Sequence, residues 1–303
     1  MIELRPITLA DKAWVDELVF AENSRSADYN FGNIYIWNKR FRRQVGRLND
    51  RVITKLRYEG KSCFVFPIGE GELRPVMDEL RRYAERKNYS PFTLCGVTEK
   101  HKDQLEELYP GAFEYEETED GEDYIYDIEK LSTYAGKALH GKKNHCNRFE
   151  KEHEWHFEPL TRALIPDCLD MLEVWTEENA ERLDESISYE HDAIVRAFAS
   201  FECLGLEGGV LFADGRIVGF TLGEMAGSDT FDVHFEKAET AMNGAYPMVC
   251  RELCRMLAEK HPELKYINRE EDMGLESLRT SKLSYKPEYR LKKYTARWKS
   301  DEA

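Results

Sequence analysis

The sequence has no long apolar run, and its acidic residues outnumber its basic ones. No window approaches the roughly 20 apolar residues of a membrane helix, and the first residues lack the apolar stretch of a secretory signal. The net charge of -15 argues against a general nucleic-acid or anionic-membrane surface, because both attract basic proteins. We therefore expect a cytoplasmic protein with no membrane span and no DNA partner.

Cysteine pairs and common catalytic fingerprints are also missing. The seven cysteines are scattered without a paired framework, which is typical of reduced thiols in a cytosol. No Gly-x-Ser-x-Gly elbow, Walker loop or dinucleotide fingerprint occurs. His153 and His156 have one-turn spacing, but no cysteine pair or His-Glu-x-x-His pattern completes a metal site. We expect no metal.

The length of 303 residues fits two domains of about 150 residues each. Strand and helix patterns repeat from residue 154 onward, with a hairpin predicted around the Asp214-Gly215 turn. The order in this half is β, α, α, β, β, β, α, β, α, β, which is that of the acetyltransferase (GNAT) fold. We predict domains at 1–129 and 154–303, joined by a bridging helix at 130–153.

A central stretch, Tyr124 to Phe149, concentrates aromatic, glycine and basic residues. Its first part reads as a strand that pairs with Phe113 to Tyr115 across an acidic loop. In the following helix Lys142, Lys143 and Arg148 form a basic cluster that suits a phosphate or carboxylate partner. The alternative is a solvated helix face whose charges offset the acidic run before it.

Four stretches together resemble soluble relatives of the C-terminal domain of bacterial phosphatidylglycerol lysyltransferase. They are DYNFGNIYIW from Asp28, YIYDIEKL with GKALHGKKNHCNRF from Tyr124, HFEKA with GAY from His234, and NREEDMG through KLSYKP from Asn268. The resemblance covers nearly the whole chain. It implies an α+β fold of two tandem acetyltransferase-like (GNAT) domains, each a twisted mixed sheet flanked by helices, and an aminoacyl-tRNA donor.

The strand ending at His234-Phe235-Glu236-Lys237 and the turn after it form one candidate site. Alternation predicts that His234 and Glu236 point to one face, where His234 is a candidate base. In the acetyltransferase fold the following turn and helix start hold the donor's pyrophosphate. The matching residues are Lys237, Gly244, Ala245 and Tyr246. Only Asn243-Gly244-Ala245 remains of the coenzyme A signature, and the alternative is a plain tight connection.

A second group follows the next strand. Acyl transfer needs a carboxylate to take a proton and a cation to hold the oxyanion. Glu271 or Asp272 is the candidate carboxylate, and Tyr285 is the candidate phenolic acid. The candidate cations are Arg269, Lys282 and Lys286. The alternative is that the two acids cap a helix starting near Gly274.

Two functions remain open. The first is an acyl or aminoacyl transferase that acts on an amine or hydroxyl, with aminoacyl-tRNA or acyl coenzyme A as the donor. The second is a non-catalytic acetyltransferase-like module that binds a small anionic ligand. The first half offers no glycine-loop or acidic site and is expected to be structural.

Overall fold

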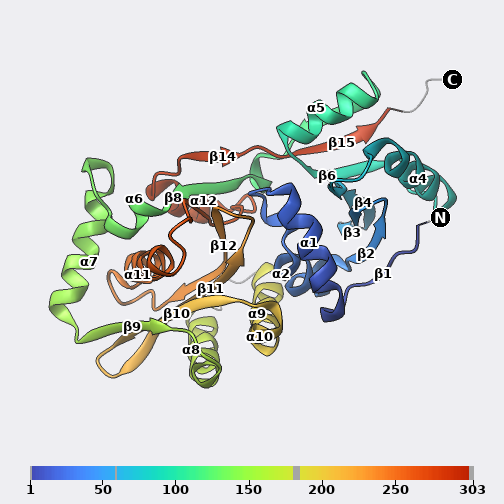
Figure 1. The fold of residues 1–303 in the computed structure, drawn as a ribbon. Helices are drawn as coiled ribbons and strands as arrows, with labels where there is room; N and C mark the ends of the chain where they lie inside the picture. Colours follow the sequence, from blue (N-terminus) through green and yellow to red (C-terminus); the bar gives the residue numbers. More distant parts are fainter. Residues whose placement is uncertain (1, 59, 180–184, 300–303) are drawn as a thin grey trace. The chain divides into compact units, whose positions relative to one another are not determined.

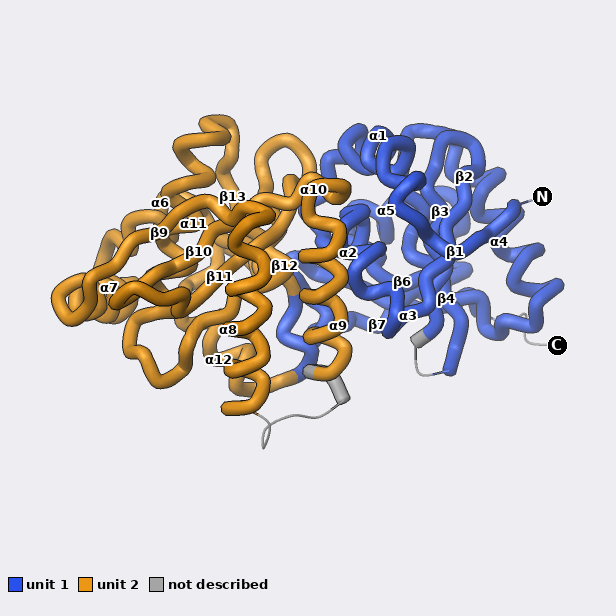
Figure 2. Tube along the Cα trace, turned by 90° about the horizontal axis from the view of Figure 1, so that it is seen from below, with its two compact units in different colours: residues 1–123, 271–274, 291–303 blue, residues 124–270, 275–290 orange. Residues whose placement is uncertain are grey.

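The computed structural model describes residues 2–58, 60–179 and 185–299. They form two compact units, coloured separately in Figure 2. Unit 1 contains residues 1–123, 271–274 and 291–303, and unit 2 contains residues 124–270 and 275–290. The chain therefore passes between the units four times, whereas we predicted contiguous domains at 1–129 and 154–303. None of the helices in the described ranges is long and apolar enough to span a bilayer.

Unit 1 is built on a mixed sheet with the strand order β1-β2-β3-β4-β6-β15-β7, and β5 pairs with β3. The strands are β1 (Arg5–Pro6), β2 (Gln44–Leu48), β3 (Arg51–Tyr58), β4 (Lys61–Val65), β5 (Ile68–Gly69), β6 (Thr93–Val97), β7 (Phe113–Glu117) and β15 (Tyr294–Trp298). The helices are α1 (Lys12–Glu22), α2 (Phe31–Ile36), α3 (Asn38–Phe41), α4 (Leu73–Arg86) and α5 (Glu99–Leu108).

Unit 2 is built on a second mixed sheet, with the order β14-β8-β13-β12-β11-β10-β9. The strands are β8 (Asp123–Asp127), β9 (Trp155–Pro159), β10 (Glu207–Ala213), β11 (Arg216–Met225), β12 (Thr230–Ala238), β13 (Tyr266–Asn268) and β14 (Tyr289–Leu291). The helices are α6 (Ile128–Thr133), α7 (His140–Glu152), α8 (Ile165–Glu178), α9 (Glu185–Ala199), α10 (Phe201–Leu204), α11 (Ala245–Lys260) and α12 (Glu276–Ser284). This confirms the predicted fold class of two mixed sheets flanked by helices.

The second sheet has a helix layer on each face. Helix α11 lies on one face, and α8 and α9 lie on the other (Figure 1). The main core forms under α11, where Leu211, Val218 and Phe231 pack against Leu253 and Leu257. The hairpin of β10 and β11 turns at Asp214 and Gly215, as predicted. Both residues have positive φ, 52° and 80°, which is the backbone geometry that an Asp-Gly hairpin turn requires.

One predicted hairpin is wrong. We expected Phe113 to Tyr115 to pair with Tyr124 to Ile128, but β7 pairs with β15, where Tyr115 lies opposite Ala296. Strand β8 instead pairs with β13, where Tyr126 lies opposite Ile267. Short alternating strands on either side of an acidic loop look like a hairpin in sequence, and nothing local shows that each strand has a distant partner.

The contacts between β12 and its neighbours set the geometry of the candidate site. Strand β13 runs parallel to β12 only from Thr230 to Asp232, although β12 continues to Ala238. On the other side, β12 has one extra residue relative to β11, because Leu222 pairs with Phe235 and Gly223 with Val233. This bulge at His234 interrupts the alternation of side chains. The prediction that His234 and Glu236 share a face is therefore wrong.

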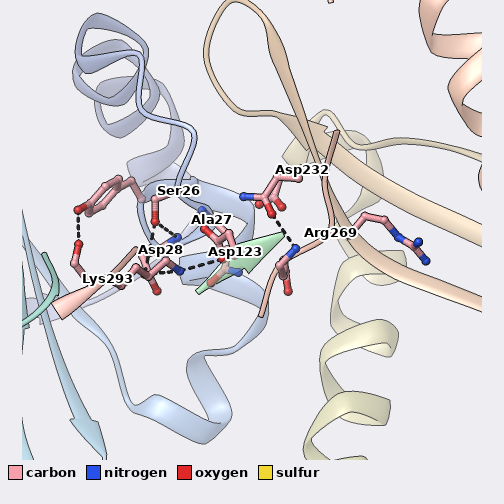
Figure 3. Close-up of polar contacts among 12 residues, drawn as sticks. Ser26, Ala27, Asp28, Asp123, Asp232, Arg269 and Lys293 are labelled. Carbon is pink, nitrogen blue, oxygen red and sulfur yellow. Dashed lines mark hydrogen bonds and ion pairs between the residues drawn. The ribbon is translucent and has the colours of Figure 1, made fainter. Parts of the chain in front are cut away.

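A buried ionic cluster in unit 1 joins two segments of the chain. One is the start of β8, where the chain first leaves the unit, and the other is the segment before β15, where it returns for the last time. The Nζ atom of Lys293, just before β15, lies 2.8 Å from Asp28 Oδ2 and 2.8 Å from Asp123 Oδ1 at the start of β8 (Figure 3). The backbone N–H of Ala27 donates to Asp123 Oδ2 at 3.0 Å. The Lys293 side chain is 5% exposed. Burial lowers its pKa, but Asp123 and Asp28 outweigh burial and raise the pKa well above the usual value.

We expect Lys293→Met to lower the free energy of unfolding by about 3–5 kcal/mol, because it leaves two carboxylates without their cation. Urea denaturation of the full chain measures this. The matched control is Lys292→Met, since the Lys292 side chain is 48% exposed and pairs with Glu117 on the surface. That control should cost less than about 1 kcal/mol. Equal losses in the two variants would contradict a structural role for the cluster.

Asp11 closes the first turn of unit 1, and α1 begins directly after it, at Lys12. Its carboxylate accepts hydrogen bonds from Arg5 Nη1 (2.9 Å), Trp14 Nε1 (3.0 Å) and the Thr8 backbone N–H (2.8 Å). Its side chain is fully buried. Burial raises the pKa of Asp11, but these hydrogen bonds outweigh burial and lower it to about 2.

Because its pKa lies below the unfolded value, ionised Asp11 stabilises the fold above about pH 4, and this contribution disappears as the pH falls through about 2. We expect Asp11→Asn to lower the free energy of unfolding by about 2 kcal/mol at pH 7. The difference from the natural chain should shrink steadily between pH 4 and 2. Urea denaturation across this range checks it, and a difference that does not change with pH would show that ionisation plays no part.

Candidate functional site

The centre of the candidate site is a shielded ion pair between Glu236 and Arg269. Glu236 lies on β12 beyond the end of its pairing with β13, and Arg269 follows β13 directly. Arg269 Nη2 lies 2.7 Å from Glu236 Oε1, and the two side chains are 12% and 8% exposed. Burial raises the pKa of Glu236, although Arg269, Lys282 and Lys142 partly oppose this. Because β13 ends at Asn268 while β12 continues to Ala238, the side of β12 at Glu236 is open, and the two charges meet there.

Two cations, Lys142 and Arg269 itself, contact the ring of Tyr285. Lys142 Nζ lies 3.7 Å from the ring centroid, and Arg269 Cζ lies 4.4 Å from it. Lys142 comes from α7, and Tyr285 directly follows α12 and is buried. Burial and the charge of Arg269 both lower the pKa of Lys142. Cation–π contacts hold the two like charges near each other.

Two buried polar atoms at this place have no hydrogen-bond partner among the residues that the structure describes. One is Arg269 Nη1, and the other is Thr221 Oγ1. Thr221 on β11 lies directly opposite Glu236 in the sheet register, so the two side chains share a face. A buried unpaired polar group costs about 1–3 kcal/mol. An acceptor oxygen of a bound ligand would remove that cost at Arg269.

Lys282 contacts the backbone of this site. Its side chain is buried, and Nζ donates to the backbone carbonyl oxygens of Arg269 and Glu270, the latter at 3.2 Å. The ammonium therefore fixes the backbone that carries Arg269. Among the other predicted cations, Lys143 and Lys286 are exposed, and Arg148 pairs with Glu152 on the surface of α7 at 2.7 Å.

The predicted donor-binding residues at the end of β12 form a separate set. Lys237 Nζ lies 2.8 Å from Glu190 Oε2 and 3.8 Å from the ring centroid of Trp175. The Trp175 indole N–H donates to the Tyr246 hydroxyl at 3.2 Å. Burial is the main reason why the pKa of Tyr246 is raised to about 12. Lys237 therefore contacts α8 and α9, whereas its neighbour Glu236 contacts Arg269.

Gly244 is explained by packing. Its φ is 93°, and a Cβ at this position would lie 2.5 Å from the carbonyl oxygen of His145 on α7. No larger residue fits so close to another backbone. Ala245 is buried as the first residue of α11. The tight connection that was the alternative interpretation of Gly244 and Ala245 is sufficient to account for them.

His234 is enclosed by carboxylates. Its Nε2 lies 3.1 Å from Glu224 Oε1, and its Nδ1 lies 2.9 Å from Glu270 Oε1 and 3.7 Å from Asp232 Oδ2. Burial lowers the pKa of His234, but the carboxylates outweigh burial and raise it well above the usual value. Both ring nitrogens of His234 thus already have carboxylate partners, and its role as a base stays a prediction.

The same residues are the place to consider for a metal ion. Within the described ranges, Asp232, His234 and Glu270 are the one group of three whose ligand atoms all lie within 4.8 Å of one another. A metal ion would bind the neutral imidazole and would therefore compete with a proton for the ring nitrogens.

The candidate carboxylates Glu271 and Asp272 belong to unit 1, whereas Arg269 and Tyr285 belong to unit 2. Asp272 is buried, and its Oδ1 accepts the backbone N–H of Gly274 at 2.9 Å. This contact closes a turn in which Met273 and Gly274 have positive φ. Helix α12 begins later, at Glu276.

Sequence reasoning missed the role of Glu236 and the partners Thr221, Trp175 and Glu190. A signal was present for two of them, because Thr221 and Glu236 are polar residues inside two otherwise apolar strands. A buried strand carries such residues only at some cost, which often marks a site. The bulge at His234, which turns Glu236 toward Arg269, leaves no mark in the sequence.

Comparison with known proteins shows which family the chain matches. The family model for the C-terminal part of phosphatidylglycerol lysyltransferase matches residues 20–297. A solved conserved protein of unknown function from Bacteroides thetaiotaomicron has 35% sequence identity and a TM-score of 0.94, and the match covers 99% of this chain and 100% of that one. The C-terminal domain of a putative lysylphosphatidylglycerol synthetase from Agrobacterium fabrum has 13% identity and a TM-score of 0.65, covering 97% and 93%.

One curated relative is the uncharacterized protein MYCGA3080 of Mycoplasmoides gallisepticum. It is 27% identical over 178 residues, which is 58% of this chain and 56% of the relative. The chain thus matches little more than half the length of that relative.

We expect Lys282→Met to lower the free energy of unfolding by about 2 kcal/mol, because two buried carbonyl oxygens lose their charged donor. Urea denaturation measures the change. Lys286→Met is the control, since this exposed lysine lies one turn further along and should cost less than about 0.5 kcal/mol. A Lys282 variant as stable as the Lys286 variant would show that the carbonyl contacts do not hold the segment after β13.

Proposed function

Because the chain belongs to the family of the phosphatidylglycerol lysyltransferase C-terminal domain, we propose that it transfers an aminoacyl or acyl group to an amine or hydroxyl acceptor. The proposed donor is an aminoacyl-tRNA, and acyl coenzyme A is the rival. The site lies in unit 2, around Glu236 and Arg269.

The observation that carries the proposal is a cationic group in a strongly acidic chain. Lys142 and Arg269 lie around Tyr285, and among the described residues Glu236 is the one carboxylate in direct contact, while the chain as a whole has a charge of -15. Lys142 makes no hydrogen bond or ion pair among the described residues, and Arg269 Nη1 is unpaired. Cations held ready in a poorly solvated place favour an anionic donor or a developing oxyanion.

The proposed reaction uses three of these groups. The acceptor nitrogen or oxygen attacks the ester or thioester carbonyl of the donor, and Arg269 Nη1 donates to the carbonyl oxygen as negative charge develops there. Glu236 takes the proton that the acceptor loses. The bond from the carbonyl carbon to the donor oxygen or sulfur then breaks, and the leaving atom takes a proton from Glu236 or, as first predicted, from Tyr285. The raised pKa of Glu236 suits a base that must give its proton back.

Other predicted residues have outer roles in this proposal. Lys143, Arg148 and Lys286 are exposed and are proposed to contact more distant phosphates of the donor. Lys282 fixes the backbone at Arg269, and Lys237, Gly244, Ala245 and Tyr246 shape the other face of β12 and the start of α11. Glu236 takes the role first given to Glu271 or Asp272, because Asp272 is already bonded to Gly274.

The second candidate function is binding without catalysis. One observation favours it: Glu236 already pairs with Arg269 at 2.7 Å, so its carboxylate is partly occupied before any acceptor arrives. A sensor for a small anion needs only the cations. The two functions differ in what happens when Glu236 loses its charge.

We expect Glu236→Gln to slow transfer by about 100-fold or more, because removing a general base typically costs at least this factor. Donor binding should survive. Transfer is followed in single-turnover reactions with a mixed aminoacyl-tRNA preparation or acetyl coenzyme A, each offered with a mixture of amine and hydroxyl acceptors. Donor binding is followed by the shift in melting temperature.

Asp272→Asn is the matched control and should leave transfer unchanged. If Asp272→Asn stops transfer and Glu236→Gln does not, the base is the one first predicted. If every donor raises the melting temperature but none reacts, the protein is an anion-binding module. Lys142→Gln should weaken donor binding more than Lys143→Gln, because Lys142 is half-buried and Lys143 is exposed.

A further inference from the structure

A groove of about 430 Å³ lies in unit 2 between α8 and the hairpin of β10 and β11. In Figure 1, α8 runs beneath β10 and β11, on the face opposite α11. Its size is within the range of small-molecule sites, which usually span about 300–1,000 Å³. Neither Glu236 nor Arg269 lines the groove. The groove is therefore separate from the Glu236–Arg269 pair, although one of its residues, Trp175, also contacts Lys237 and Tyr246.

One face of α8 supplies most of its wall. Asp167, Asp170, Val174 and Glu178 follow one another at helical spacing, so they lie on the same face. Among the described residues, the three carboxylates have no hydrogen bond or ion pair. Exposed acids on a helix are common, so the charges alone would not make a site. The side chains that form the wall between the acids supply a second observation.

That wall is apolar. Val174 is 52% exposed and lies between Asp170 and Glu178. Met171, Trp175 and Ile217 continue the apolar surface. An occupant that only neutralised the acids would leave this surface in water. An occupant with a hydrocarbon body would cover it.

The opposite wall carries one cation, which is already neutralised. Arg216 on β11 contacts both oxygens of Glu239, with Nη2 at 2.9 Å from Oε2. Bidentate pairs of this kind are strong. The hydrogen-bonded partner of Arg216 is therefore Glu239, and Glu178 of α8 adds only a weaker electrostatic contribution that also raises the pKa of Arg216. The groove keeps a net negative charge of three from Asp167, Asp170 and Glu178.

A metal ion does not fit these acids. A single ion needs carboxylate oxygens that converge within a few ångströms. Over the described ranges, the group of three that meets this condition is Asp232, His234 and Glu270, and no residue of the groove is in it. The acids are spread along the helix, with apolar residues between them. This pattern fits an ammonium group at the end of an apolar chain.

We propose that the groove between α8 and the β10–β11 hairpin binds a small organic amine, whose ammonium group contacts Asp170 or Glu178 and whose hydrocarbon part covers Val174. The proposal does not depend on transferase activity. It rests on the apolar wall, on the unpaired acids beside it and on the paired state of Arg216.

The test is isothermal titration calorimetry of the full chain with n-hexylammonium up to about 10 mM, a range that detects weak binding. Saturable binding is expected. Asp170→Asn and Glu178→Gln should each weaken it about 3-fold, and the double variant about 10-fold, as typical for exposed charge contacts. Val174→Ser should weaken n-hexylammonium but not ethylammonium, because only the longer chain covers the wall.

Three controls make the test decisive. n-Hexanol has the same chain without the charge and should not bind measurably. Glu177→Gln removes one charge from the same helix outside the groove, so it should leave the affinity unchanged. All four positions are exposed, so the variants should keep the melting temperature of the natural chain. The proposal is overturned if n-hexylammonium does not saturate, if n-hexanol binds equally well, or if Glu177→Gln weakens binding as much as Asp170→Asn.

Discussion

The early end of the pairing between β12 and β13 is the constraint on which the candidate site depends. Only Thr230 to Asp232 have a partner on β13, so the last residues of β12 have an open side. In a continuous sheet, Glu236 would lie beside a β13 residue and Arg269 would be part of that strand. Because β13 stops at Asn268, the guanidinium of Arg269 turns into the opening and meets the carboxylate of Glu236. Elements distant in sequence then close the opening with Lys142 and Tyr285.

The bulge at His234 places two sets of charged side chains on opposite faces of the sheet. It sends His234 toward Glu224 and Asp232 and leaves Glu236 on the face of α11. One face therefore has an imidazole ring surrounded by three carboxylates, and the other has a carboxylate near three cations. The first set has an excess of acidic groups and the second an excess of basic groups. One inserted residue in a strand thus creates two different electrostatic environments a few residues apart.

The sequence was sufficient for the fold class and for local features such as the Asp214-Gly215 hairpin. These depend on local signals: turn residues with positive φ, capping groups and apolar spacing. Partner choice between strands is not local. The sequence could not show that β7 pairs with β15, or that β8 pairs with β13.

The candidate site shows the same division between local motifs, which the sequence reveals, and contacts between distant residues, which it does not. The motifs around His234 and Arg269 could be found, and so could their basic neighbours Lys142 and Lys282. Their roles could not, because a role depends on which atom faces which. His234 was a candidate base and is enclosed by carboxylates, whereas Glu236 was given no role and contacts Arg269.

The position of β15 has a consequence for the order in which the protein is completed during synthesis. In the first sheet β15 lies between β6 and β7, and β7 has no other neighbour in that sheet. Residues 294–298 leave the ribosome after all of unit 2 has been made. Until then β7 has an unpaired edge on each side, and Asp28 and Asp123 lack the ammonium of Lys293. The half of the molecule that is translated first is therefore the last to be finished, and a nascent chain must keep this gap from pairing with other strands.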